Sequence, residues 1–226
     1  MGYINSLQDY LNYEKQQEET RAASASSAKW FKLADKESYK IRFLQELDVN
    51  SPFFSTKNGT NVWVLEHTVP GNFRIKAECT FNEGSCYGCE QQRAGIKGWK
   101  PKVRFYINVL ARTLDGKSEQ VCVLSQGTSA RGIVPTLTEH SLDNGGITNR
   151  WWKVSRKGAS QEDTAYLATP SMSTLADDEP GVEIFDLFDL KKLTKHVPYD
   201  EQEVFYNSGA VAAKPIAVAS SVDEAW

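Results

Sequence analysis

The sequence predicts a mainly β domain of the small Greek-key barrel type, interrupted by a metal-binding insertion. After Trp30, β-branched and aromatic residues alternate with polar ones between turn signals over most of the chain. Within that stretch, one His and three Cys lie close together between His67 and Cys89. Five or six antiparallel strands with one connecting helix are typical of such a barrel.

The alternation places strands at residues 39–47, 61–69, 102–112, 120–127, 150–156 and 164–168. Asn-Gly and Asp-Gly pairs at 58–59, 115–116 and 144–145 mark the turns between them. Residues 128–142 are expected to form a short helix or an irregular connector, whose length Pro135 limits.

Helical extensions are expected at both ends of this core. Apolar residues at helical spacing predict a helix over residues 3–14, followed by a small, polar linker up to residue 28. The core then spans residues 29–206, with the insertion at about residues 67–95. Spacing and end charges predict a packing helix over 182–196, and residues 207–226 show no packing pattern and are expected to be disordered.

The ligand spacing His67, Cys79, Cys86 and Cys89 is typical of a zinc site. Two thiols separated by two residues can face one ion, and four protein ligands fill a tetrahedral shell. We therefore expect one structural Zn²⁺ per chain. Two alternatives stay open: ordinary buried thiols, or a redox pair of Cys86 and Cys89, although the latter is typical of a βαβ context that the pattern lacks.

Composition narrows the class of protein. No apolar run approaches the roughly 18 residues of a membrane span, and the polar start lacks the apolar region of a signal peptide. Cys122 alternates with valines and is expected to be a core cysteine in a reducing compartment. We expect a cytoplasmic location and no membrane partner.

The net charge of −3 hides an asymmetry. Residues 28–160 hold 20 Lys and Arg against 12 Asp and Glu, whereas residues 171–226 hold 4 against 11. A basic centre with an acidic end is typical of proteins that bind polyanions, although a solvated charged face would give the same counts.

Cations alternate with aromatic residues in two blocks, residues 91–112 and 149–158. Unpaired bases expose flat faces beside phosphates, so a groove for single strands needs both residue types. Adjacent strand residues point to opposite faces, so one ring of each pair, Phe105/Tyr106 and Trp151/Trp152, is expected to point outward. Such a ring could instead cover a helix. The candidate contacts are Arg93, Lys97, Trp99, Lys100, Lys102, Arg104, Phe105, Tyr106, Arg112, Arg150, Trp151, Trp152, Lys153, Arg156 and Lys157.

An enzyme is not expected. The sequence contains no Gly-rich phosphate loop of the P-loop or dinucleotide type, and no Ser, His and Asp constellation stands out. The acidic run 177–179 precedes an expected helix, where capping explains it better than metal binding. The alternatives are a zinc-containing interaction or transcription-regulating module that binds protein or duplex DNA, and, third, a zinc-stabilised nuclease or deaminase.

Several motifs in order resemble the single-stranded DNA-binding, helix-destabilising proteins of T-even-type bacteriophages. They are Lys29-Trp30-Phe31-Lys32-Leu33, Ile41-Arg42-Phe43-Leu44, the ordered His and Cys set, Phe105-Tyr106-Ile107-Asn108, Asp163-Thr164-Ala165-Tyr166-Leu167 and Phe185-Asp186-Leu187-Phe188-Asp189-Leu190. The resemblance covers about residues 28–206 and adds Tyr166 to the candidate contacts.

This resemblance implies an OB-fold with an inserted zinc lobe and a basic, aromatic cleft. It also implies a phage-encoded protein that coats single-stranded DNA in replication, recombination and repair. Such a protein would bind other replication or recombination proteins through its acidic tail. The family's N-terminal arm is basic and supports cooperative self-association on DNA. Here residues 1–21 hold only Lys15 and Arg21 against four acids, so self-association is left open.

Overall fold

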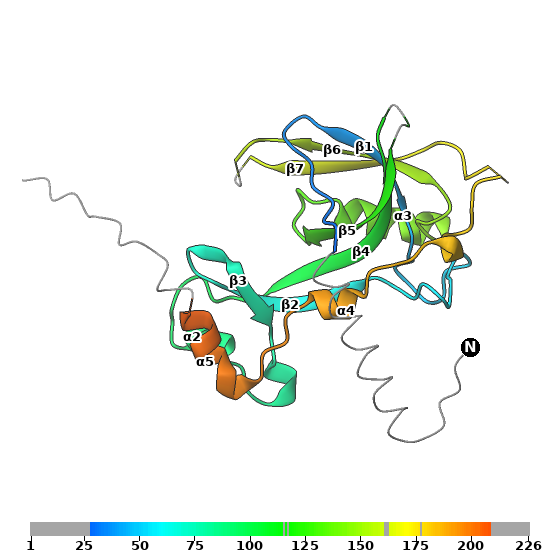
Figure 1. The fold of residues 1–226 in the computed structure, drawn as a ribbon. Coiled ribbons are helices and arrows are strands. Elements are labelled where there is room, and N and C mark those ends of the chain that lie inside the picture. The colour runs from blue at the N-terminus through cyan, green and yellow to red at the C-terminus, as the bar shows by residue number, and fades with distance from the viewer. Residues whose placement is uncertain (1–27, 115, 117, 161–162, 177, 209–226) are drawn as a thin grey trace, which may run out of the picture. The chain divides into compact units, whose positions relative to one another are not determined.

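The computed structural model describes residues 28–208, apart from 115, 117, 161–162 and 177 (Figure 1). The helix expected at residues 3–14, its linker and the tail beyond Ser208 therefore lie outside the described residues. The chain divides into two compact units. The first unit comprises described residues up to Leu65 together with 102–194, and the second comprises 66–101 together with those from Lys195 onward.

Seven strands form the sheet: β1 (Ser38–Phe43), β2 (Val62–Val69), β3 (Asn72–Glu78), β4 (Lys102–Arg112), β5 (Glu119–Gly127), β6 (Trp151–Lys157) and β7 (Ala165–Pro170). Their order is β3-β2-β4-β1-β6-β7, and β5 pairs with β4. The strand pairs with a described register are antiparallel, and the sheet is not closed within the described residues. The mainly β prediction is confirmed, and all six expected strands are present.

Strand β3 was not among the expected strands, because it lies within the residues of the expected insertion. Its apolar residues Phe73, Ile75 and Ala77 alternate with Arg74, Lys76 and Glu78, which is a strand pattern. Gly71 turns the chain from β2 into β3 with a φ of 78°. Strand β2 connects the two units along the chain, because it begins in the first unit and ends in the second.

The main core of the first unit lies between the sheet and helix α3 (Val134–Asn144). Ile41, Phe105 and Trp152 from three strands pack there with Val134 and Leu137 of the helix. Pro135 lies in the first turn of α3, where its missing N–H costs nothing, and Gly145 ends the helix in the left-handed conformation. The expected connector at residues 128–142 is thus a helix that begins six residues later.

Residues 175–193, here called the covering segment, lie over the opposite side of these strands. Leu175, Val182, Phe185 and Leu187 pack on Leu44, Leu110 and Trp151, and Phe188, Leu190 and Leu193 pack on Tyr106 and Val123. Strands β4, β5 and β6 therefore carry buried side chains on both faces. This arrangement decides which aromatic residues remain accessible.

The packing helix expected at residues 182–196 is wrong. The segment contains one 3-10 turn, η2 (Val182–Ile184), an extended stretch, and one helical turn, α4 (Leu190–Leu193). The buried Asn108 amide explains the extended stretch, because its Nδ2 donates to the Phe188 carbonyl at 3.0 Å and its Oδ1 accepts from the Phe188 N–H at 3.1 Å. These bonds replace those that a helix would supply.

The second unit is built from the β2–β3 hairpin, the 3-10 turn η1 (Phe81–Glu83), α2 (Tyr87–Arg93) and α5 (Tyr199–Asn207). Ala77, Trp99, Val197 and Tyr206 form its core. Helix α5 was not expected from the sequence. No helix among the described residues is long and apolar enough to cross a membrane.

Candidate metal centre and aromatic surface

The four expected metal ligands come together in the second unit. His67 lies in β2, Cys79 follows β3, and Cys86 and Cys89 lie at the start of α2. Their ligand atoms are all within 4.8 Å of one another, with Cys79 Sγ to Cys89 Sγ at 3.5 Å and Cys89 Sγ to His67 Nε2 at 3.3 Å. The four cysteines of the chain are free of disulfides. This cluster could hold a metal ion.

The His67 ring is oriented by the backbone. Its Nδ1 lies 2.7 Å from the Trp99 carbonyl oxygen. A carbonyl can only accept, so Nδ1 carries the proton and the lone pair of Nε2 faces the thiols. The ring is fully buried, and burial lowers the His67 pKa, which favours the neutral form that binds metals.

Gly88 allows the His67 ring to lie directly against α2. A Cβ at this position would be 2.4 Å from Cγ of His67, closer than real atoms approach. The φ of Gly88 does not lie in the left-handed range. Its role is close approach of a side chain to the helix.

The three thiols lie near one another in a partly buried site. Burial, together with the neighbouring thiols, raises the pKa of Cys89 to about 12, and burial raises that of Cys79. Burial also acts to raise the pKa of Cys86, but hydrogen bonds, chiefly from the backbone N–H groups of Cys89 and Thr80, lower it overall. A cation among the thiols would favour all three thiolates, so metal binding here should release protons.

Gln202 of α5 holds the loop that contains these ligands by hydrogen bonds. This role was not expected from the sequence. Its buried amide donates to Thr80 Oγ1 at 2.8 Å and to the Val197 carbonyl at 2.9 Å, and accepts from the Tyr87 N–H at 2.9 Å. Thr80 Oγ1 donates in turn to the Ser85 carbonyl at 2.6 Å. A lone Gln far along the chain gives no sequence signal for this role.

The rings of each aromatic pair point to opposite faces of the sheet, as expected, but no ring of either pair is exposed. Phe105, Tyr106 and Trp152 are at most 1% exposed, and Trp151 is 5% exposed. Phe105 and Trp152 face the main core, whereas Tyr106 and Trp151 lie under the covering segment. None of these rings offers a free face to a base.

The two remaining aromatic candidates differ from each other. Trp99 of the second unit is buried against Tyr87 and Tyr206, so it offers no free face either. Tyr166 of the first unit is half-buried, beside the Arg156 guanidinium.

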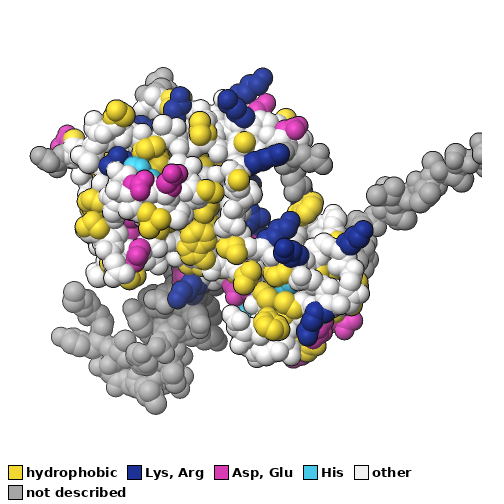
Figure 2. Space-filling model, turned by 180° about the vertical axis from the view of Figure 1, so that it is seen from behind, with side chains coloured by type: hydrophobic (Ala, Val, Ile, Leu, Met, Phe, Trp, Pro, Cys, Tyr) yellow, Lys and Arg dark blue, Asp and Glu magenta, His cyan; other side chains and the backbone are white. Residues whose placement is uncertain are grey.

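The candidate cations form two groups. Three arginines make intramolecular contacts: Arg112 pairs with Glu119 and lies 4.2 Å from the Trp151 ring, Arg150 donates to the Ser171 carbonyl, and Arg156 donates to the Leu33 carbonyl. Arg104 is half-buried. The exposed candidates are Arg93, Lys97, Lys100, Lys102, Lys153 and Lys157. On the face shown in Figure 2, Lys and Arg side chains stand in several separate groups.

Two exposed tryptophans of the first unit were not among the candidates. Trp30 is 41% exposed and Trp63 is 42% exposed. Trp30 lies edge-on to Tyr106 with ring centroids 6.2 Å apart, and Trp63 is tilted against Phe105 at 4.7 Å. The sequence offered a signal for the exposure of Trp63, because it alternates with Val62 and Val64, which are partly buried on the other face.

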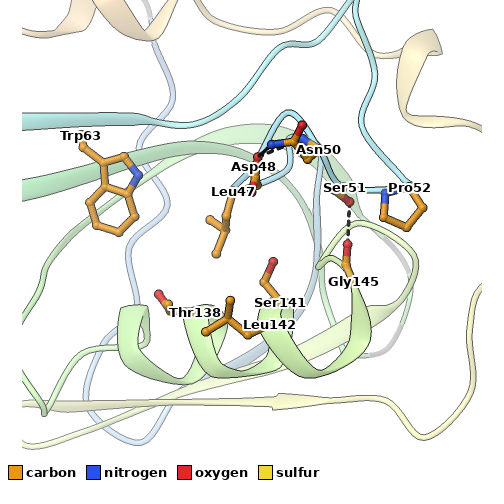
Figure 3. Close-up of a pocket in the computed structure, with 10 residues that line it drawn as sticks. All are labelled: Leu47, Asp48, Asn50, Ser51, Pro52, Trp63, Thr138, Ser141, Leu142 and Gly145. Carbon is orange, nitrogen blue, oxygen red and sulfur yellow. Dashed lines mark hydrogen bonds between the residues drawn. The ribbon is translucent and has the colours of Figure 1, made fainter.

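Trp63 forms one wall of a pocket of about 400 Å³ within the first unit (Figure 3). Leu47 and the loop up to Pro52 form another wall, and Thr138, Ser141 and Leu142 of α3 lie across from it. Several of its polar groups are already paired. Asp48 accepts from Asn50, and Ser51 Oγ donates to the Gly145 carbonyl at 2.7 Å.

Comparison with known proteins does not identify the chain. It matches no protein-family model, no curated protein and no solved structure.

Proposed function

We propose that this chain is a non-enzymatic, sequence-independent single-stranded DNA-binding protein stabilised by zinc. The observation that carries the proposal is an exposed tryptophan, Trp30, with the exposed Lys29 and Lys32 close to it in the sequence, on backbone that is hydrogen-bonded to β5. Flat rings that stack on bases and cations that meet phosphates are the two components of single-strand recognition. The resemblance to the phage proteins points to the same class.

The proposed fold behind this function is an OB-type barrel. The partial order β5-β4-β1-β6-β7, with α3 between β5 and β6, supports a partly open five-stranded barrel. OB-folds bind oligonucleotides across the face of their central strands. The hairpin β2–β3 and the second unit would then be the insertion.

Zinc is the metal that we propose for the cluster. Tetrahedral bonds of about 2.3 Å to sulfur and 2.05 Å to nitrogen place two sulfurs about 3.8 Å apart and a sulfur and nitrogen about 3.5 Å apart. The separations of 3.5 Å and 3.3 Å in the cluster fall slightly short of these values. Three thiols and one imidazole would complete the shell, so the ion would stabilise the second unit and would not activate water.

Tryptophan fluorescence titrations of the full chain test the DNA-binding proposal. Single-stranded DNA should quench the fluorescence and bind more tightly than duplex DNA of the same sequence, and single-stranded RNA should be compared in parallel. Equal or tighter binding to the duplex would contradict the proposal, as would turnover of the oligonucleotide.

A protein-interaction module is the second candidate function, and the Trp63 pocket favours it. The pocket has apolar walls, and its one charged lining residue among those described is Asp48. It would fit an apolar side chain followed by a Lys or Arg of a partner protein. If Trp63→Ala abolished binding of a partner and left DNA affinity unchanged, this function would be supported in addition to the first.

A further inference from the structure

Trp30 is an exposed ring on a fixed backbone. The Phe31 N–H donates to the Val123 carbonyl at 2.8 Å, and the Val123 N–H donates to the Lys29 carbonyl at 2.7 Å, so the residues on both sides of Trp30 are tied to β5. The edge contact with Tyr106 supports the ring from beneath. Such a ring loses little conformational freedom when it stacks on a ligand.

The side chains around Trp30 alternate between the core and solvent. Phe31 and Leu33 pack on the main core, while Trp30 and Lys32 are exposed. Lys29 is also exposed, but it lies beside Cys122 of the main core. Burial raises the pKa of that thiol, and the Lys29 charge acts in the opposite direction. A flat, apolar face and the cation Lys32 therefore lie on the same side of this segment.

Trp63 provides a natural comparison within the same unit. It is exposed to the same degree, but none of the described residues that line its pocket is Lys or Arg. Asp48 lines the pocket, and Glu139 and Asp143 are exposed on α3 beside Leu142. Phosphates would be attracted to the surroundings of Trp30 and repelled from those of Trp63.

We propose that Trp30 stacks on a base of the bound single strand, and that Lys32 contacts a phosphate next to that base. This inference rests on the proposed function and assigns the stacking role to a residue outside the two basic blocks. The buried pairs Phe105/Tyr106 and Trp151/Trp152 then support the surface from beneath and do not contact bases.

The test compares Trp30→Ala with the matched variant Trp63→Ala in the full chain. Trp30→Ala should weaken binding of an oligodeoxythymidine by about 5- to 150-fold, the range for losing one stacked base. Trp63→Ala should leave this affinity unchanged. On an abasic strand of the same length, the wild type and Trp30→Ala should bind equally, because there is no base to stack.

Two further variants separate stacking from folding. Trp30→Phe keeps a flat ring, so it should retain most of the affinity while losing part of the fluorescence quenching that DNA produces. Trp30→Leu keeps an apolar contact with Tyr106 but should bind as weakly as Trp30→Ala. Lys32→Ala should reduce the slope of log affinity against log salt by about 0.7.

The outcomes distinguish this inference from the proposed function. If the wild type does not bind single strands, the proposed function fails. If the wild type binds, and Trp30→Ala and Trp63→Ala bind oligodeoxythymidine as tightly as it does, only the assignment of Trp30 is overturned. An equal loss for Trp30→Ala on the abasic strand would also overturn it, since the ring would then act on something other than a base.

Discussion

Sequence patterns predicted both a His and Cys cluster in the second unit and exposed aromatic rings in the first unit. The cluster is present, whereas the rings of the two aromatic pairs are buried. The four ligands converge, and every one of them lies between residues 67 and 89. The rings that face away from the main core, Tyr106 and Trp151, are also buried, because residues 175–193, distant in the sequence, cover them. Spacing within one short segment predicts what converges there, whereas the exposure of a side chain depends on which distant segment covers it.

Disruption of the cluster should have the largest effect. Cys86→Ser, or removal of the metal by a chelator, should unfold the second unit, because binding of a structural zinc contributes on the order of 10 kcal/mol to folding of small domains. Metal analysis should give about one zinc per chain for the wild type and little for Cys86→Ser. The melting transition of the second unit should be lost.

Cys122→Ser is the matched control, since Cys122 lies in the core of the first unit and outside the cluster. It should keep its full metal content. Wild-type protein prepared without chelators that contains no metal would contradict the metal assignment.

The next largest effect should come from the buried aromatic residues. Trp152→Ala should destabilise the first unit by about 3–5 kcal/mol, because the ring is fully buried and packs edge-on against Phe43 and His140. Urea unfolding should show a much smaller loss for the half-exposed Trp63→Ala. If both variants lost the same free energy of unfolding, the description of Trp152 as buried and Trp63 as exposed would be contradicted.

The substitution Gly88→Ala tests whether close packing of the His67 ring on α2 is needed for metal binding. A Gly to Ala change inside a helix normally stabilises it by about 0.5–1 kcal/mol. Here the new methyl group would displace the His67 ring, so metal affinity should fall by about 10- to 100-fold, as for other changes that misorient a ligand. Competition with a zinc chelator measures the affinity.

Gly127→Ala is the matched control for this substitution. A Cβ at Gly127 would meet nothing within 4 Å, so metal affinity should not change. If Gly88→Ala also retained wild-type affinity, the His67 ring would not be held against α2 in solution.

The smallest effect should be the dependence of stability on pH. Burial lowers the His67 pKa from its ordinary value of 6.5, so between the two values the unfolded chain binds a proton that the folded chain does not. Stability of the second unit should therefore be complete above about pH 6.5 and fall as the pH drops below it. Proton competition for the metal ligands acts in the same direction. Metal retention that does not change between about pH 7 and pH 5 would contradict this.

The sequence predicted the six strands well, because alternation is read from neighbouring residues and needs no tertiary information. It missed β3, whose alternation was hidden by the assumption that the whole ligand segment was irregular. The helix expected at residues 182–196 failed for a tertiary reason. Apolar residues at helical spacing pack equally well in an extended chain when a buried amide such as that of Asn108 binds the backbone.

The candidate site, like the fold, was predicted only in part. The metal ligands could be named from their spacing, but the Trp99 carbonyl and Gln202, which orient the site, are distant in sequence and of ordinary type. For the aromatic surface, residue type predicted the chemistry but not the positions. Trp30 precedes the first strand, outside the dense blocks of cations and rings, and only the structure shows that it is exposed.

The central claim, that exposed cations hold the backbone of a single strand, is tested most directly by the salt dependence of binding. Affinity of the full chain for an oligodeoxythymidine should be measured at several salt concentrations. Each neutralised phosphate contributes about −0.7 to the slope of log affinity against log salt, so about four to six contacts predict a slope of roughly −3 to −4. A slope near zero would contradict the account.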